Sequence, residues 1–199
     1  MARVKRKINT LLHNPNGVKR KYGMILRFLM RRAPVPIYHE DYNAHWNYFS
    51  FKDKTILDLG ADYGSTAYFF GKNGASKVIA VEGDKIFFKK LKKYALRYRY
   101  IVPIELMINS KEDIKRLIST YSPDIVKVDI EGAERLFIDF SRDCLNMVDE
   151  WLIETHEPSL SERLVEKFSV SGFSVKKIRQ SEVHDILVIE RKRARAETY

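Results

Sequence analysis

Cysteine is almost absent from the chain, and several other features are missing altogether. Cys144 is the only cysteine among 199 residues, so no disulfide can form within the chain, and we expect a reducing, cytoplasmic setting. No cysteines and histidines have the spacing of a zinc site, and nothing in the sequence calls for a metal ion. No apolar run reaches the roughly 18 residues of a membrane-spanning helix. The nearest, YGMILRFLM, contains Arg27 and precedes no small-residue cleavage site, so we expect no signal peptide.

Acidic residues are missing from one long stretch. Residues 1–32 hold ten Lys and Arg but no Asp or Glu, and residues 191–199 hold four basic residues and one acid. The two ends therefore account for the whole formal net charge of +10, and residues 33–190 are close to neutral. Basic ends commonly serve solubility or a loose attraction to polyanions; the alternative is a specific contact with RNA or a membrane surface.

Apolar runs and helical patterns alternate from about residue 55 onward. Strands are predicted at residues 55–60, 77–83, 103–109, 124–130 and 147–156, and helices at residues 65–74, 85–98, 110–118, 133–140 and 160–168. Residues 173–179 and 183–190 have the pattern of an antiparallel hairpin. This alternation predicts an α/β fold: a Rossmann-like, doubly wound, mostly parallel sheet with helices on both faces. We assign residues 51–190 to this domain and residues 191–199 to a basic tail.

Capping signals stand before three of these helices. Asp84 is placed to cap the second helix. Ser110 with Asp113, and Ser159 with Glu162, have the spacing of a capping box.

Residues 1–50 differ in style from the rest. VKRKYGMILRFLMRR predicts a basic amphipathic helix, whereas APVPIYHEDYNAHWNYF is dense in aromatics and is expected to be irregular. This segment either packs against the core or forms a lid in which Tyr38, Tyr42, Trp46 or Tyr48 covers a substrate.

Ligands of such sheets bind beyond the carboxyl ends of the strands. The first strand leads into DLGADYG, where Gly60 and Gly64 allow the backbone to turn sharply and approach a ligand. A dinucleotide fingerprint needs a glycine where Asp62 stands, and a carboxylate there repels a pyrophosphate. Glu82, at the end of the second strand, can accept hydrogen bonds from ribose hydroxyls, and Asn109 and Ser110 suit an adenine edge. Together these positions describe a nucleoside with a cationic 5′ substituent, such as S-adenosylmethionine.

The motifs also resemble those of a known group. ILDLGADYGSTA looks like the glycine-rich loop of class I S-adenosylmethionine-dependent methyltransferases, and VIAVEGD like their ribose-binding strand. IVKVDIEGAE and WLIETHEP are similar to segments of the FkbM-type methyltransferases. The resemblance covers about residues 53–190 and implies a seven-stranded sheet whose last strand runs antiparallel. It departs from the family at EGD, where a proline-containing turn is common, and residues 1–50 match nothing in the family.

We therefore expect the cofactor to be held by residues at the ends of four strands. By the resemblance, Asp58, Gly60, Asp62 and Gly64 shape the methionine pocket, Glu82 binds the ribose, and Asn109 or Ser110 lies by the adenine. The full set of expected cofactor-binding residues is Asp58, Gly60, Ala61, Asp62, Gly64, Ser65, Glu82, Gly83, Asn109, Ser110 and Asp129.

Three carboxylates follow the fourth strand in VKVDIEGAE. Glu134 suits the start of the next helix, while Asp129 and Glu131 are candidates for contacting the cofactor, the acceptor or a bound cation. A hydroxyl acceptor must lose its proton as it attacks. His156 is the favoured general base by its intrinsic pKa, and Glu154, Asp129 and Glu131 are rivals.

The leading prediction is thus an S-adenosylmethionine-dependent methyltransferase acting on a hydroxyl of a small molecule, sugar or lipid-linked acceptor. The alternatives are an RNA methyltransferase that uses the basic ends, a nicotinamide oxidoreductase, and a catalytically silent protein that binds nucleic acid or a membrane surface. The fourth strand lacks the Asn/Asp-Pro-Pro-aromatic turn associated with amino-group methylation of bases, which argues against base N-methylation but not against methylation of a ribose oxygen.

Overall fold

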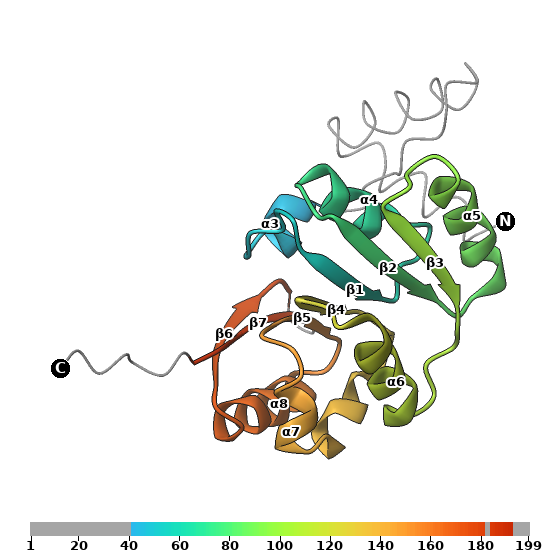
Figure 1. The fold of residues 1–199 in the computed structure, drawn as a ribbon. Coiled ribbons are helices and arrows are strands. Elements are labelled where there is room, and N and C mark those ends of the chain that lie inside the picture. The colour runs from blue at the N-terminus through green and yellow to red at the C-terminus, as the bar shows by residue number, and fades with distance from the viewer. Residues whose placement is uncertain (1–40, 182–183, 193–199) are drawn as a thin grey trace, which may run out of the picture. The chain divides into compact units, whose positions relative to one another are not determined.

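A seven-stranded sheet, in the order β3-β2-β1-β4-β5-β7-β6, forms the centre of the computed structural model, which describes residues 41–181 and 184–192 (Figure 1). The strands are β1 (Thr55–Leu59), β2 (Lys77–Glu82), β3 (Ile101–Glu105), β4 (Ile125–Val128), β5 (Glu150–Thr155), β6 (Phe173–Arg179) and β7 (Asp185–Arg191). Strands β1 to β5 pair in parallel, and β7 runs antiparallel between β5 and β6. The predicted seven-stranded α/β sheet with an antiparallel last strand is confirmed.

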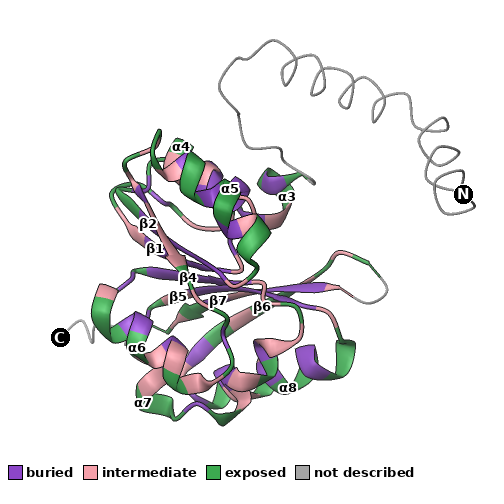
Figure 2. Ribbon diagram, turned by 90° about the vertical axis from the view of Figure 1, so that its right-hand side faces the viewer, coloured by how far each residue is buried: buried purple, intermediate pink, exposed green. Residues whose placement is uncertain are grey.

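Helices cover both faces of this sheet (Figure 1). One face carries α3 (Tyr42–Trp46), α4 (Ser65–Lys72) and α5 (Lys85–Ala95). The other carries α6 (Lys111–Tyr121), the 3₁₀ helix η1 (Ala133–Asp139), α7 (Arg142–Leu145) and α8 (Pro158–Val170). Successive strand residues point to opposite faces, so Ile56 packs in the α3–α5 core and Leu57 in the α6–α8 core. The central strands are therefore packed against helices on both faces, and Figure 2 shows them largely buried.

Local sequence signals predicted some helix starts correctly and others incorrectly. The Asp84 carboxylate accepts from the backbone N–H groups of Ile86 and Phe87, and Ser110 and Asp113 form the predicted capping box. The Ser159–Glu162 capping box is wrong: α8 begins at Pro158, because a proline at the first helical position has no N–H that needs a partner.

Several boundaries also differ from the expected ones. The third strand was expected at residues 103–109 and runs instead from Ile101 to Glu105. The segment expected to be irregular contains α3, whose Tyr42 and Trp46 are buried in the same core as Phe51. The compact domain therefore includes residues before position 51.

Part of the expected organisation lies outside the described residues: the basic amphipathic helix, Tyr38, and residues 193–199 of the tail. Within the described ranges, the helices are too short or too polar to traverse a bilayer.

Candidate active site

A pocket of about 520 Å³ opens at the carboxyl edge of the sheet. Its walls come from the segments that follow β1, β2, β3, β4 and β5, with Tyr42 of α3 beside them. Six of the eleven expected cofactor residues line it, namely Gly60, Ala61, Asp62, Glu82, Gly83 and Asp129. The other three candidate bases, Glu131, Glu154 and His156, line it as well. Residues far apart in the sequence thus meet at the place expected for a ligand of a parallel sheet.

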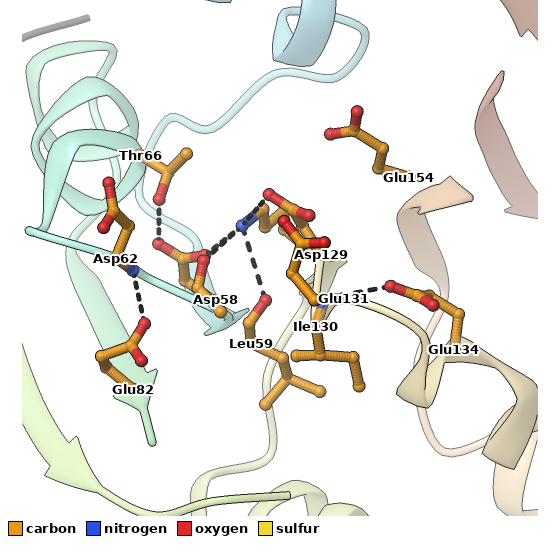
Figure 3. Close-up of polar contacts among 12 residues, drawn as sticks. Asp58, Leu59, Asp62, Thr66, Glu82, Asp129, Ile130, Glu131, Glu134 and Glu154 are labelled. Atoms are coloured by element: carbon orange, nitrogen blue, oxygen red, sulfur yellow. Dashed lines mark hydrogen bonds and ion pairs between the residues drawn. The ribbon is translucent and has the colours of Figure 1, made fainter. Parts of the chain in front are cut away.

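The glycine loop has a tight steric requirement at Gly60. This residue has φ = +78°, and a Cβ there would lie 1.7 Å from the carbonyl oxygen of Asp129. The absence of a side chain lets the ends of β1 and β4 approach each other at the pocket floor. Asp62 also has a positive φ, of +48°, and its backbone N–H donates to Glu82 Oε2 at 2.8 Å (Figure 3).

Glu82 is buried at the end of β2, and both of its carboxylate oxygens face backbone donors. Oε2 accepts from the Asp62 N–H, and Oε1 accepts from the Asp84 N–H at 2.7 Å. Burial raises the pKa of this carboxyl, and the two backbone hydrogen bonds act against that rise. Each oxygen keeps a second lone pair, so Glu82 can still accept hydrogen bonds from a ligand in the pocket.

Lys127 is a charged residue of this site that the sequence did not lead us to expect. Its side chain is completely buried at the pocket floor, where Nζ lies 3.2 Å from Asp58 Oδ1 and 3.5 Å from Asp129 Oδ2. Nζ also donates to the Gly60 carbonyl oxygen at 2.7 Å. Burial alone lowers the pKa of a lysine, but the two flanking carboxylates outweigh it and hold the pKa of Lys127 above its ordinary value. Lys127 therefore stays charged and ties β4 to the glycine loop.

A signal for Lys127 was present in the sequence. It is the one charged residue in IVKV, a run that becomes a strand buried at every position. A buried lysine needs partners, and Asp58 lies directly opposite it in the register of β1 and β4.

His156 lies among three carboxylates at the other side of the pocket. Its Nδ1 lies 3.5 Å from Glu134 Oε1, and its Nε2 lies 3.8 Å from Asp129 Oδ1 and 4.0 Å from Glu131 Oε2. Hydrogen bonding to Glu134, with further attraction from all three carboxylates, raises the pKa of His156 to about 9. Its imidazole is therefore protonated at neutral pH. The ordinary pKa of histidine, for which it was proposed as a general base, does not apply here.

The same cluster has the donor atoms of a cation site. Asp129, Glu134 and His156 each offer one ligand atom, and these atoms lie within 4.8 Å of one another. Glu134 is fully buried and is also used by the fold, since it accepts from the N–H group of Ile130 (Figure 3) and from that of Gly132. The imidazolium of His156 places a positive charge between these carboxylates.

Five predicted cofactor residues do not line the pocket. Asp58 lies beneath it, where it binds Lys127 and accepts from Thr66 Oγ1 at 2.5 Å. Gly64 and Ser65 start helix α4. Asn109 and Ser110 serve the start of α6, since both of their N–H groups face the Asp113 carboxylate. Their place in the pocket is taken by residues that sequence reasoning did not select: Leu106, Met107 and Ile108, together with Thr66, Phe87 and His184.

The pKa of His156 should make stability depend on pH. Its value is about 9 in the folded chain against 6.5 ordinarily, so its stabilising contribution is complete below about pH 6.5 and is lost as the pH rises through 9. We expect the difference in free energy of unfolding between the wild type and His156→Gln to shrink by about 1–3 kcal/mol between pH 6 and pH 9.5. Urea denaturation at both pH values measures it.

Glu134→Gln is the companion variant, because this carboxylate is the main cause of the shift. It should remove most of the same pH dependence. The groups facing His156 are Asp129, Glu131, Glu134 and the ring of His184, 4.8 Å away between centroids. A wild-type advantage that stayed constant from pH 6 to pH 9.5 would contradict the protonated state.

Comparison with known proteins identifies the fold. No family model and no curated protein matches the chain. Among solved structures, Aeropyrum pernix fibrillarin in complex with S-adenosyl-L-methionine is 16% identical with a TM-score of 0.54, covering 71% of this chain and 68% of that one. Precorrin-6y C5,15-methyltransferase from Geobacter metallireducens is 13% identical with a TM-score of 0.53, covering 71% and 81%. Ribosomal protein L11 methylase from Lactobacillus delbrueckii is 17% identical with a TM-score of 0.51, covering 71% and 72%. This chain therefore has the Rossmann-like fold of class I methyltransferases.

Proposed function

We propose that the chain is an S-adenosylmethionine-dependent methyltransferase that acts on a hydroxyl oxygen. The observation that carries this proposal is the charge of the pocket. Six carboxylates line it, those of Asp62, Glu82, Asp84, Asp129, Glu131 and Glu154. They outnumber the two cations of the lining, Lys127, which Asp58 balances from below, and the protonated His156. A sulfonium is favoured in such a pocket, and a diphosphate is repelled.

The residues present fit the cofactor in their chemistry. Glu82 has free lone pairs for ribose hydroxyls, and the backbone at Gly60 and Ala61 can lie against a ligand without long side chains intervening. Leu106, Met107 and Ile108 form an apolar wall suited to a base. When bound, S-adenosylmethionine supplies a methyl group already activated by its sulfonium, so the chain mainly has to align the acceptor.

His156, Asp129 and Glu131 are proposed to handle the proton of the acceptor. Lys127 and His156 each lie near a different oxygen of the Asp129 carboxylate and hold it at the pocket wall. His156 can accept a proton only while its imidazole is neutral. Its pKa of about 9 means that the neutral form predominates only at alkaline pH. The rate should therefore rise with pH up to about 9, and His156→Gln should remove the rise.

Replacement of Glu82 tests the cofactor site. We expect Glu82→Ala to weaken the binding of S-adenosylmethionine by about 1–3 kcal/mol, because a charge-assisted hydrogen-bond acceptor is lost. Isothermal titration calorimetry measures the change. NADH, titrated in the same way, should give no heat, since the carboxylates of the loop oppose its diphosphate.

Glu105→Ala is the matched control. Glu105 lies beside Glu82 in the register of β3 and β2 but outside the pocket, so its removal makes the same change of charge at the same edge of the sheet. Its affinity should equal that of the wild type. Equal affinities of the two variants would place the ribose elsewhere, and absence of binding in the wild type would favour a catalytically silent protein.

RNA is the second candidate acceptor, supported by the ten basic residues of positions 1–32. The structural neighbours include fibrillarin as well as enzymes named for a small molecule and for a ribosomal protein, so they favour neither acceptor class. A salt titration of RNA binding separates the cases, because phosphate contacts weaken steeply as salt rises. Affinity that hardly changed between low and moderate salt would remove the RNA case.

A further inference from the structure

A second concave surface lies away from the active-site pocket, between helix α5 and the edge strand β3. It is a groove of about 650 Å³, within the range of ligand-binding clefts. Strand β3 is the last strand of the sheet on this side (Figure 1). The groove is lined by four lysines, Lys85, Lys89, Lys92 and Lys93, and by the apolar residues Phe88, Ala95, Leu96, Ile101 and Pro103.

The charge of this surface is of one sign. Between Asp84 and Glu105 the chain has seven Lys and Arg residues and no acid. Positions 85, 89, 92 and 93 recur at helical spacing, so their side chains lie on one side of α5. In the described part of the chain, none of the four lysines forms an ion pair with a carboxylate. Glu105 is the one acid among the residues that line the groove, so within the described part of the chain the lysine charges are not neutralised.

The apolar part of the groove distinguishes between anionic ligands. Leu96 is 87% exposed, although a leucine gains by leaving water. The aromatic ring in the groove, Phe88, is only 8% exposed and cannot serve as a stacking platform for bases, on which single-stranded nucleic acids depend. Lysines around an exposed leucine are typical of surfaces that lie on anionic membranes, where the ammonium groups meet phosphates and the apolar side chain enters the acyl boundary.

We propose that the groove between α5 and β3 binds anionic phospholipid at a membrane surface. Lys85, Lys89, Lys92 and Lys93 contact the lipid phosphates, and Leu96 enters the acyl layer. This surface is separate from the carboxylate-lined pocket, and the inference does not depend on the methyl-transfer reaction. It would bring a lipid-linked acceptor and the enzyme to the same surface.

Co-sedimentation of the full chain with vesicles tests the proposal. Vesicles of 30 mol% phosphatidylglycerol in phosphatidylcholine should bind the wild type, and vesicles of phosphatidylcholine alone should not. The triple variant Lys89→Gln, Lys92→Gln, Lys93→Gln should bind the anionic vesicles at least about tenfold more weakly, since each lysine near such a surface adds several-fold to affinity. Leu96→Ser, which leaves every charge in place, should also weaken binding several-fold.

The control is Lys111→Gln with Lys115→Gln on α6, which covers the other face of the sheet (Figure 1). This variant loses positive charge away from the groove and should bind as the wild type does, which separates the groove from the basic ends of the chain. Equal binding by the triple variant and this control would overturn the proposal. So would wild-type binding to a single-stranded RNA that the triple variant loses while neither protein binds vesicles. All variants should keep the wild-type circular dichroism and affinity for S-adenosylmethionine.

Discussion

Lys127→Met is expected to lower the free energy of unfolding by about 3–5 kcal/mol, the cost of leaving buried charges without their partner. Methionine matches the length and apolar stem of lysine but removes the ammonium group that lies between Asp58 and Asp129. Asp58 is fully buried, so its carboxylate would keep only the hydroxyl of Thr66 as a donor. Urea denaturation followed by circular dichroism measures the loss.

The control is Lys54→Met, at a partly exposed lysine that pairs with Glu150 at 2.5 Å. A pair in contact with water contributes about 1 kcal/mol or less, so this variant should be nearly as stable as the wild type. Combining Lys127→Met with Asp58→Asn should recover part of the lost stability, because one unpaired charge is removed together with its partner. If Lys127→Met were no more harmful than Lys54→Met, Lys127 would not be the group that neutralises Asp58.

Gly60→Ala is expected to have the second large effect: a loss of at least about 3 kcal/mol of stability, together with loss of S-adenosylmethionine binding. The added methyl group would lie 1.7 Å from the Asp129 carbonyl oxygen, and a backbone atom can only move away if the end of β1 or of β4 moves. Both strand ends form the pocket floor, so either movement distorts the site. Thermal denaturation and calorimetry with S-adenosylmethionine measure the two effects.

Gly172→Ala separates the clash from the cost of a positive φ. Gly172 has φ = +99°, but a Cβ there meets only the end of the Arg142 side chain, at 3.4 Å. It should cost about 1 kcal/mol and leave cofactor affinity unchanged. Gly60→Ala with the stability and affinity of Gly172→Ala would show that the strand ends can separate without harm.

The fold could be predicted because its signals are local. The four residues of VIAV are all buried in β2, and such an apolar run predicts an interior strand. Asp84 and Ser110 cap helices that begin at the very next residue. The start of α8 was predicted incorrectly because two local signals competed there. Ser159 and Glu162 have the spacing of a capping box, but the helix begins one residue earlier, at Pro158. A helix start is thus predicted correctly where a single capping signal is present.

The site could be predicted only in part, because its contacts join distant strands. Glu82 was selected from its position at the end of the second strand alone, and it lines the pocket. Asn109 and Ser110 were assigned to adenine, yet their polar groups serve the capping of α6. The pairing of Lys127 with Asp58 depends on β1 and β4 lying side by side, and the pKa of His156 depends on Glu134 in another element.

The position of Lys127 opposite Asp58 also bears on how the sheet assembles. Side chains alternate between the two faces of a strand, so sliding β4 past β1 by one residue would turn Lys127 toward the α6–α8 side, among Leu57 and Leu59. An ammonium ion in that hydrocarbon would be strongly unfavourable. The ion pair of Lys127 and Asp58 thus raises the free energy of intermediates in which β1 and β4 are out of register. It therefore favours the correct alignment of these two strands during folding.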